Sequence, residues 1–179
     1  MVALIQFELT NSAYAATGWI SKNNGDIFVL KTNGDGDSLW TKTFDGYGNF
    51  DEGFCAIENT NKDIFVSGYF RPDNKTIYGL FIKLTNYGDV IFLLSEFDSS
   101  YDYGFRSMIC DSLYIIGYGR GNLYAYSCNG DSLWLSNLTG NSGRGDKCLG
   151  IINNHFICAG EYEMNWDDYI MLAKTDWTG

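Results

Sequence analysis

One acidic, glycine-rich phrase returns along this 179-residue chain and limits the folds that the chain can adopt. Three segments run from apolar residues into the same turn, namely Phe28–Trp40, Leu80–Phe92 and Asn122–Trp134. Their glycines coincide, and so do the aromatic residues that follow: Gly36, Gly88 and Gly130, then Trp40, Phe92 and Trp134. The C-terminal segment Ile170–Gly179 begins the same pattern and reaches the glycine. Self-similarity at a fixed period is the signature of a repeat architecture.

Two further landmarks share this period. A glycine inside an apolar run occurs four times, at Gly18, Gly68, Gly117 and Gly160. An acidic residue opens an apolar stretch three times, at Asp51, Asp102 and Asp146. Three independent markers that all recur at spacings of 42–52 residues are not produced by chance, so the repeat is real.

Each period contains four short runs of strand-forming residues separated by turn signals. The second copy predicts strands at Gly53–Glu58, Asp63–Phe70, Tyr78–Leu84 and Val90–Phe97. The composition agrees, because the chain has 13 Tyr and 12 Phe but a single Pro, and aromatic residues favour strands. Segments with a helical period of useful length are absent from the sequence.

A period of this length with four short strands is typical of a β-propeller blade. One four-stranded meander has two apolar faces, and stacking against other blades buries them. We therefore predict an all-β fold, a β-propeller of four-stranded antiparallel blades, with about four blades of which the last is incomplete. The predicted blades are residues 2–44, 51–97, 102–138 and 146–179, within one domain that spans residues 1–179.

The phrase Asn33–Trp40 could in principle bind calcium through its acidic and amide oxygens. A calcium loop needs Gly at its sixth position and Glu at its twelfth, but here these positions hold Ser38 and Phe44. We therefore predict no metal, and place the phrase in the turn between the third and fourth strands, where Gly favours positive φ. The aromatic residue after the turn is predicted to fill the seam between blades.

Some of these motifs resemble known propeller repeats. The segment Gly121–Trp134 is similar to the repeat of pyrroloquinoline-quinone-type propellers, whose blades end in a Gly-x-x-x-Trp docking motif. The pieces Lys31–Gly36 and Lys174–Gly179, with the acidic connector Asp45–Gly53, look more like another group. These are K-T-D-x-x-G-x-x-x-W repeats of secreted or surface-attached bacterial propellers of unassigned function. The resemblance implies an extracellular or cell-surface location, whereas fold-forming motifs leave the activity open.

About three and a half blades are too few for a usual closed ring of six to eight, although four-bladed rings exist. Two explanations stay open: the chain is a piece of a longer propeller, or two copies complete one propeller as a homo-oligomer. Because the sequence stops within a repeat, at the turn glycine, the first explanation is favoured.

Charge and hydropathy exclude several partners. The formal net charge is -10 and the pI is about 4.3, so the surface repels phosphate backbones and nucleic acid is not expected as a partner. No apolar run approaches the roughly 18 residues of a membrane span, so we expect no membrane insertion. The start, Met1–Phe7, has no signal-peptide pattern. The five cysteines lack CxxC spacing, which favours buried thiols over a disulfide framework.

The sequence offers no constellation of catalytic residues, and we predict no cofactor. His155 is the single histidine, which rules out a multi-histidine metal site in one chain. The acidic residues that recur at the entry to the innermost strands are Asp51, Asp102 and Asp146. They either cap backbone N–H groups in the connectors, the favoured interpretation, or contact a ligand at one rim.

Aromatic residues in or beside polar connectors are the other ligand-binding candidates, because such rings stack on sugars or anchor protein partners. The candidates are Tyr47, Tyr101, Tyr103 and Trp166, with Phe50 and Tyr169 beside them. The alternative is that these rings plug the seams between blades.

Three functions remain for such a chain. The favoured one is a non-enzymatic propeller module that binds a protein or a glycan outside the cell. The second is part of a propeller enzyme of the quinoprotein or glycosidase type. The third is a structural half-propeller that self-assembles.

Overall fold

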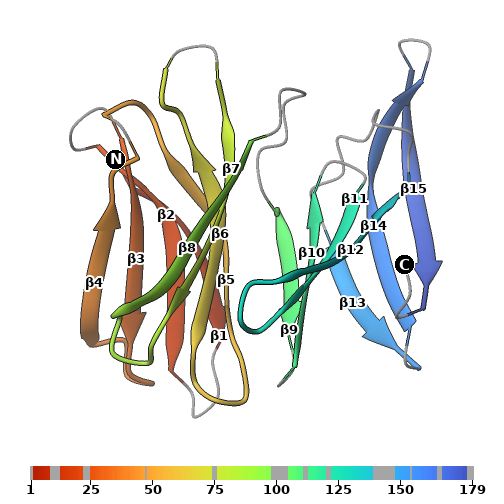
Figure 1. Ribbon diagram of the computed structural model, residues 1–179. Helices are drawn as coiled ribbons and strands as arrows, with labels where there is room; N and C mark the ends of the chain where they lie inside the picture. The colour runs from red at the N-terminus through yellow and green to blue at the C-terminus, as the bar shows by residue number, and fades with distance from the viewer. Residues whose placement is uncertain are drawn as a thin grey trace. The chain divides into compact units, whose positions relative to one another are not determined.

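The computed structural model describes residues 2–8, 13–21, 25–46, 48–73, 76–97, 105–110, 113–119, 122–138, 148–153, 155–164 and 167–176. The chain divides into two compact units, Met1–Gly104 and Phe105–Gly179, and each is described by itself. Within the described residues, all regular structure is β, and the strands form four antiparallel sheets (Figure 1).

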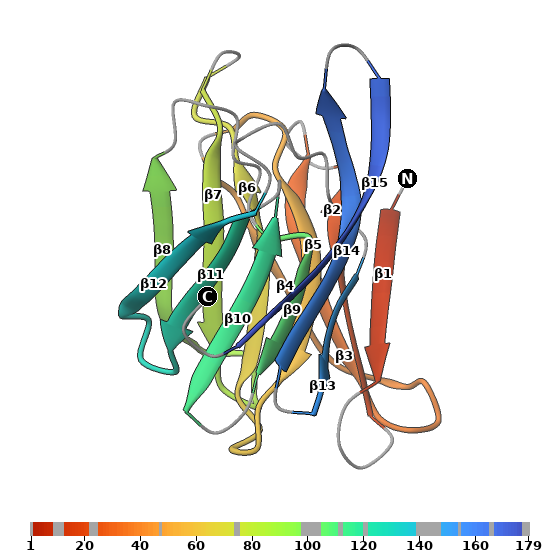
Figure 2. The same cartoon turned by 90° about the vertical axis from the view of Figure 1, so that its right-hand side faces the viewer.

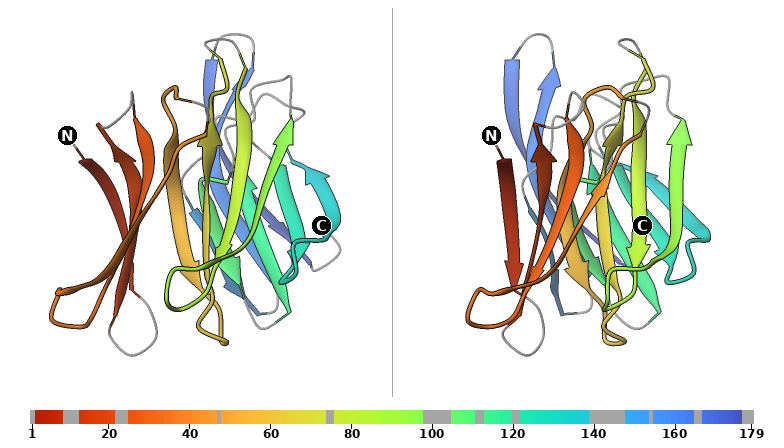
Figure 3. Two further views of the ribbon diagram at one scale, coloured as in Figure 1. Left: turned by 60° about the vertical axis from the view of Figure 1, so that its left-hand side comes forward. Right: turned by 90° about the vertical axis from the view of Figure 1, so that its left-hand side faces the viewer.

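The first unit contains two four-stranded sheets, blade one and blade two, whose strands follow one another in chain order. Blade one consists of β1 (Val2–Glu8), β2 (Tyr14–Ile20), β3 (Asp26–Thr32) and β4 (Ser38–Phe44). Blade two consists of β5 (Glu52–Glu58), β6 (Ile64–Phe70), β7 (Tyr78–Leu84) and β8 (Val90–Phe97). The two sheets lie face to face, red to orange and yellow to green in Figure 3.

The second unit contains blade three and blade four. Blade three consists of β9 (Ser107–Cys110), β10 (Tyr114–Gly119), β11 (Asn122–Ser127) and β12 (Ser132–Asn137). Blade four has three strands among the described residues: β13 (Cys148–Ile152), β14 (His155–Met164) and β15 (Asp167–Thr175). Figure 2 shows β14 and β15 as the longest pair of this unit. The prediction of an all-β propeller fold with about four antiparallel blades is confirmed.

The repeated phrase forms the turn before each fourth strand. Gly36, Gly88 and Gly130 have φ of 88°, 84° and 94°, in the left-handed region that glycine enters without strain. In blade one, Asn33 Oδ1 accepts the N–H groups of Asp35 and Asp37 at 3.0 and 2.8 Å. The side-chain oxygen of Asn33 thus accepts hydrogen bonds from the backbone of its own turn.

A bulge recurs at the same place in three blades. The pairing of third and fourth strands shifts between Lys31 and Thr32, between Lys83 and Leu84, and between Ala125 and Tyr126. A bulge increases the local twist, and the repeat thus includes a bulge at one fixed position as well as the turn.

Each unit has its own core between its two sheets. In the first unit, alternate residues of β3 and β7 meet, and Ile27, Val29, Ile82 and Leu84 are completely buried. In the second unit, residues of blade three such as Tyr118 and Leu123 pack with Phe156 and Cys158 of blade four. Burial of these alternating side chains removes apolar surface from water, which is the main stabilising term of the fold.

The aromatic residue of the outer strand closes the seam. Trp40 packs against the first core, and its Nε1–H donates to the Asn86 carbonyl oxygen at 2.9 Å. A Cβ atom added to Gly88 would lie 3.0 Å from the Trp40 ring, so the ring covers the next blade's turn glycine. In the second unit, Trp134 contacts Phe156 with ring centroids 6.5 Å apart.

Candidate functional site: the connector and the groove beside it

Of the candidate ligand-binding residues, Asp51, Phe50 and Tyr169 belong to the described part of the chain. The others lie outside the described residues: Tyr47, Tyr101, Asp102, Tyr103, Asp146 and Trp166. The site can therefore be built around the first connector, which joins β4 to β5.

Asp51 is completely buried where the connector enters β5. Its Oδ2 accepts the Gly46 N–H at 2.6 Å, and its Oδ1 accepts the Arg71 N–H at 2.9 Å. Burial is the main cause that raises the pKa of this carboxyl above its ordinary value, and the two backbone N–H bonds lower it in part. Because both oxygens are held by backbone groups, this geometry supports the connector-capping interpretation.

Further hydrogen bonds brace the same connector. Asp45 Oδ1 accepts the Gly48 N–H at 2.7 Å, and Asn49 Nδ2 donates to the Pro72 carbonyl oxygen at 3.1 Å. A Cβ atom on Gly46 would lie 2.2 Å from the Phe70 ring, so the backbone rests directly on this ring. The connector is therefore a preorganised loop, which is the form in which loops carry binding residues.

Phe50 of this connector serves as a seam residue. Its ring lies 5.1 Å from Trp19 and 6.3 Å from Tyr69, centroid to centroid. It also covers Gly25, because a Cβ atom there would lie 2.7 Å from Phe50 Cδ2. On β15, Tyr169 is partly exposed.

An open groove lies beside the connector, between the outer strands of blades one and two. We call it the connector groove; its volume is about 440 Å³. Its lining residues come from β4, the connector, β6 and β8, and are Thr43, Phe44, Asp45, Gly46, Phe70, Leu93 and Ser95. Phe70 is buried and Leu93 is 41% exposed, so the groove has an apolar floor and one accessible apolar wall. Thr43, Asp45 and Ser95 supply hydroxyl and carboxylate groups at its edge.

A buried lysine between blades one and two was not among the predicted site residues. Lys31 Nζ lies 3.4 Å from Glu58 Oε1 and also contacts Asn86 Oδ1. The side chains of Lys31 and Glu58 are both almost fully buried. A lysine at the same repeat position in blade two, Lys83, contacts Asp63 at 3.0 Å. The sequence contained a signal for this buried pair, because a lysine recurs at the same position of an otherwise apolar strand.

The remaining reactive side chains have structural surroundings. His155 Nδ1 lies 2.8 Å from the Asn153 carbonyl oxygen in the β13–β14 turn. Cys55 and Cys158 are buried, and burial raises the pKa of the Cys158 thiol. In the described part of the chain no three or more His, Cys, Asp or Glu residues gather as metal ligands do. A search of those residues for a helix suited to crossing a membrane finds none.

Comparisons with known proteins were made on sequence and on structure. No protein-family model matches the chain, and no curated protein sequence matches it. Among solved structures, a protein of unknown function from Bacteroides caccae is similar, with a TM-score of 0.49 and 12% identity over 98% of this chain and 73% of that one. BamB from Moraxella catarrhalis has a TM-score of 0.35 and 9% identity over 89% of this chain and 76% of that one.

Proposed function

We propose that this chain is a non-enzymatic β-propeller repeat module that binds a protein or a glycan through the connector groove. The observation that carries the proposal is the groove itself, a cavity of about 440 Å³ beside a braced loop. Binding sites of small ligands and side chains are typically concave and largely apolar, with a few polar groups that set orientation. Phe44, Phe70 and Leu93 supply the apolar part, and Asp45 with its neighbours supplies acceptors.

The hydrogen bonds of the connector support this proposal. A loop held at Gly46, Gly48 and Asn49 loses little conformational entropy when a ligand binds. The carboxylate of Asp51 shapes the loop from below, since it accepts two backbone N–H groups. The proposed location is outside the cell or at its surface, and it is supported by the resemblance of the Lys31–Gly36 and Asp45–Gly53 segments to secreted and surface-attached repeats.

The test compares two substitutions on one strand. Leu93→Lys places a charge in the groove wall, whereas Ile91→Lys changes a similarly exposed residue two positions earlier that does not line the groove. The purified proteins are screened against an immobilised glycan panel and a random-peptide display library. A ligand of the groove should bind the wild type and Ile91→Lys equally and bind Leu93→Lys at least about tenfold more weakly.

Two results would contradict the proposal. One is the absence of any specific ligand from both collections. The other is a ligand whose affinity falls equally in both variants, because it would then bind somewhere else. Turnover of a glycan or oxidation of a substrate by the purified chain would refute the non-enzymatic part.

A further inference from the structure

Residues at one repeat position have different surroundings in different blades. In each blade, we call the side that carries Lys31 or its repeat equivalent the front face, and we call the opposite side the rear face. On the front face of blade one, Ile27 and Val29 are completely buried and Lys31 is 4% exposed. Blade two covers these residues. Ile27 and Val29 pack in one core cluster with residues of blade two, and Lys31 forms an ion pair with Glu58 of blade two.

Blade four repeats this triplet with the opposite environment. Ile170, Leu172 and Lys174 occupy the positions of Ile27, Val29 and Lys31 when the Lys-Thr pairs are aligned. Ile170 is 88% and Leu172 75% exposed, and Lys174 is exposed as well. Between them, Met171 faces the other way and is buried against blade three. The front face of blade four is therefore an uncovered apolar surface with a lysine at its end.

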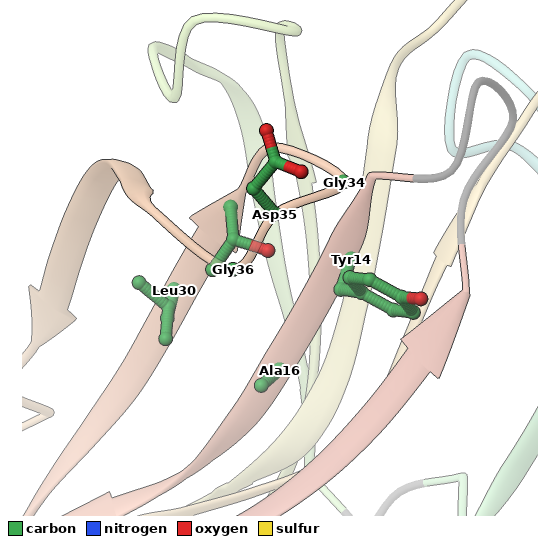
Figure 4. A pocket seen from close by; sticks show the side chains of 7 residues that line it. Tyr14, Ala16, Leu30, Gly34, Asp35 and Gly36 are labelled. Carbon is green, nitrogen blue, oxygen red and sulfur yellow. The ribbon is translucent and has the colours of Figure 1, made fainter.

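The rear face of blade one is the complementary surface. In blade two, the rear-face residues are completely buried under blade one; they are Ile64, Val66, Ile82 and Leu84. Their repeat equivalents in blade one line an open cavity of about 430 Å³ instead; they are Tyr14 and Leu30, which are half-buried, and Ala16 and Thr32, which are 7% and 9% exposed. Figure 4 shows Tyr14, Ala16 and Leu30 on neighbouring strands, with the turn of Gly34, Asp35 and Gly36 beside them.

The turn glycines give a second, independent measure of this cavity. A Cβ atom on Gly88 of blade two would lie 3.0 Å from Trp40 of blade one, whereas a Cβ atom on Gly36 would have no atom within 4 Å. The two glycines have nearly equal φ, so their surroundings differ and their conformation does not. The place that a neighbouring blade occupies on blade two is open on blade one.

The strand register places residues of opposite charge at matching positions of the two faces. Lys31 pairs with Glu58, the last residue of β5, which is opposite Ile64 in the sheet register. Glu8 holds the same register position in blade one, as the last residue of β1 opposite Tyr14. Lys174 is the equivalent of Lys31. If the front face of blade four of one copy packed on the rear face of blade one of another, Lys174 would therefore lie next to the register position of Glu8.

We propose that the chain self-associates, with the front face of blade four of one copy seated on the rear face of blade one of a second copy. A second copy supplies the two apolar side chains, Ile170 and Leu172, and the lysine, Lys174, that this rear face lacks. A head-to-tail contact of this kind forms a closed ring when its rotation closes, and the smallest such ring is a dimer, in which both faces of each chain are used. This inference is independent of the proposed function, because the connector groove shares no residue with either face.

The test measures the mass of the 179-residue chain by sedimentation velocity between about 1 and 100 µM. We expect a dimer of the 20.1 kDa chain. Leu30→Glu on the rear face and Leu172→Glu on the front face should each weaken the dimer at least about tenfold. Ile91→Glu, at an exposed residue of the outer strand of blade two, is the matched control and should leave the dimer intact.

Mixing the two variants tests the head-to-tail pairing. The mixture retains one intact contact, between the front face of the Leu30→Glu chain and the rear face of the Leu172→Glu chain. Heterodimers should therefore form in the mixture although each variant alone is mainly monomeric. Lys174→Glu should also weaken association, and Glu8→Lys in the same chain should restore it.

Three results would overturn the inference. They are a wild-type monomer at about 100 µM, a dimer that neither variant weakens, and variants that stay monomeric after mixing while their circular dichroism and melting match the wild type. If Leu30→Glu fails to fold, the Lys174→Glu and Glu8→Lys pair decides the question. Their double variant must then associate as the wild type does.

Discussion

Replacing Asp51 by Ala should destabilise the first unit more than almost any other single change in a connector. The substitution removes the acceptors of the Gly46 and Arg71 N–H groups, which lie 2.6 and 2.9 Å from the carboxylate. A hydrogen bond to a charged acceptor contributes about 1.5–3 kcal/mol. Since the site is completely buried, water does not replace the lost acceptors, and we expect a loss of about 3–5 kcal/mol.

Urea unfolding followed by tryptophan fluorescence measures this loss as a shift of the midpoint at constant slope. Asp51→Asn keeps one carbonyl oxygen and should cost about half as much as Asp51→Ala. Asp35→Ala, in an exposed turn, is the matched control and should change stability by less than about 0.5 kcal/mol. If Asp51→Ala cost less than about 1 kcal/mol, the capping role would be refuted and a ligand-binding role for Asp51 would regain weight.

The pH dependence provides a separate check on the same residue. Burial raises the folded-state pKa of Asp51 above its ordinary value of 3.8, so the folded state holds this proton more tightly than the unfolded state does. The linked stabilisation is complete below pH 3.8 and is lost as the pH rises through the folded pKa. Asn does not titrate, so the stability difference between wild type and Asp51→Asn should be larger at pH 4 than at pH 7. A difference that is constant or larger at pH 7 would contradict the assigned direction.

Two further predictions concern Trp40, which packs between blades one and two. Gly36→Ala and Gly88→Ala both place a side chain at positive φ, which costs about 1–2 kcal/mol, but only the methyl group of Gly88→Ala would also meet Trp40. Gly88→Ala should therefore have the lower urea midpoint. Equal midpoints would contradict the packing of the Trp40 ring over Gly88. Trp40→Phe should cost about 1 kcal/mol in the same assay, because it removes the indole N–H bond to the Asn86 carbonyl oxygen.

The fold was predictable because its determinants are local and repeated. A turn glycine such as Gly88 needs positive φ in every copy, and the strands on either side alternate or run apolar over fixed lengths. In blade two, the predicted third and fourth strands coincide with β7 and β8, and the first two differ by one residue at their starts. Repetition lets weak local signals add up, and this is why the architecture could be derived from one sequence.

The connector groove could not be predicted, because it depends on how two outer strands separate rather than on any motif. Phe44 and Leu93 lie in different repeats and have ordinary strand patterns, yet they line one cavity. The buried pair of Lys31 and Glu58 was missed for the same reason: its partners lie in neighbouring blades. Interactions that repeat stacking creates are invisible in a single copy.

Self-association must overcome the charge of the whole chain, and this makes its salt dependence informative. Each copy carries a formal net charge of -10, so two copies repel at long range, while burial of Ile170 and Leu172 contributes about 1.5–3 kcal/mol per side chain. Salt screens distant charges beyond a Debye length of about 10 Å at 0.1 M, but it leaves apolar burial intact. If the apolar faces carry the contact, the dimer should become tighter between about 0.05 and 0.5 M NaCl. Weakening over this range would mean that the Lys174 and Glu8 charges carry most of the affinity, and the apolar argument would be wrong.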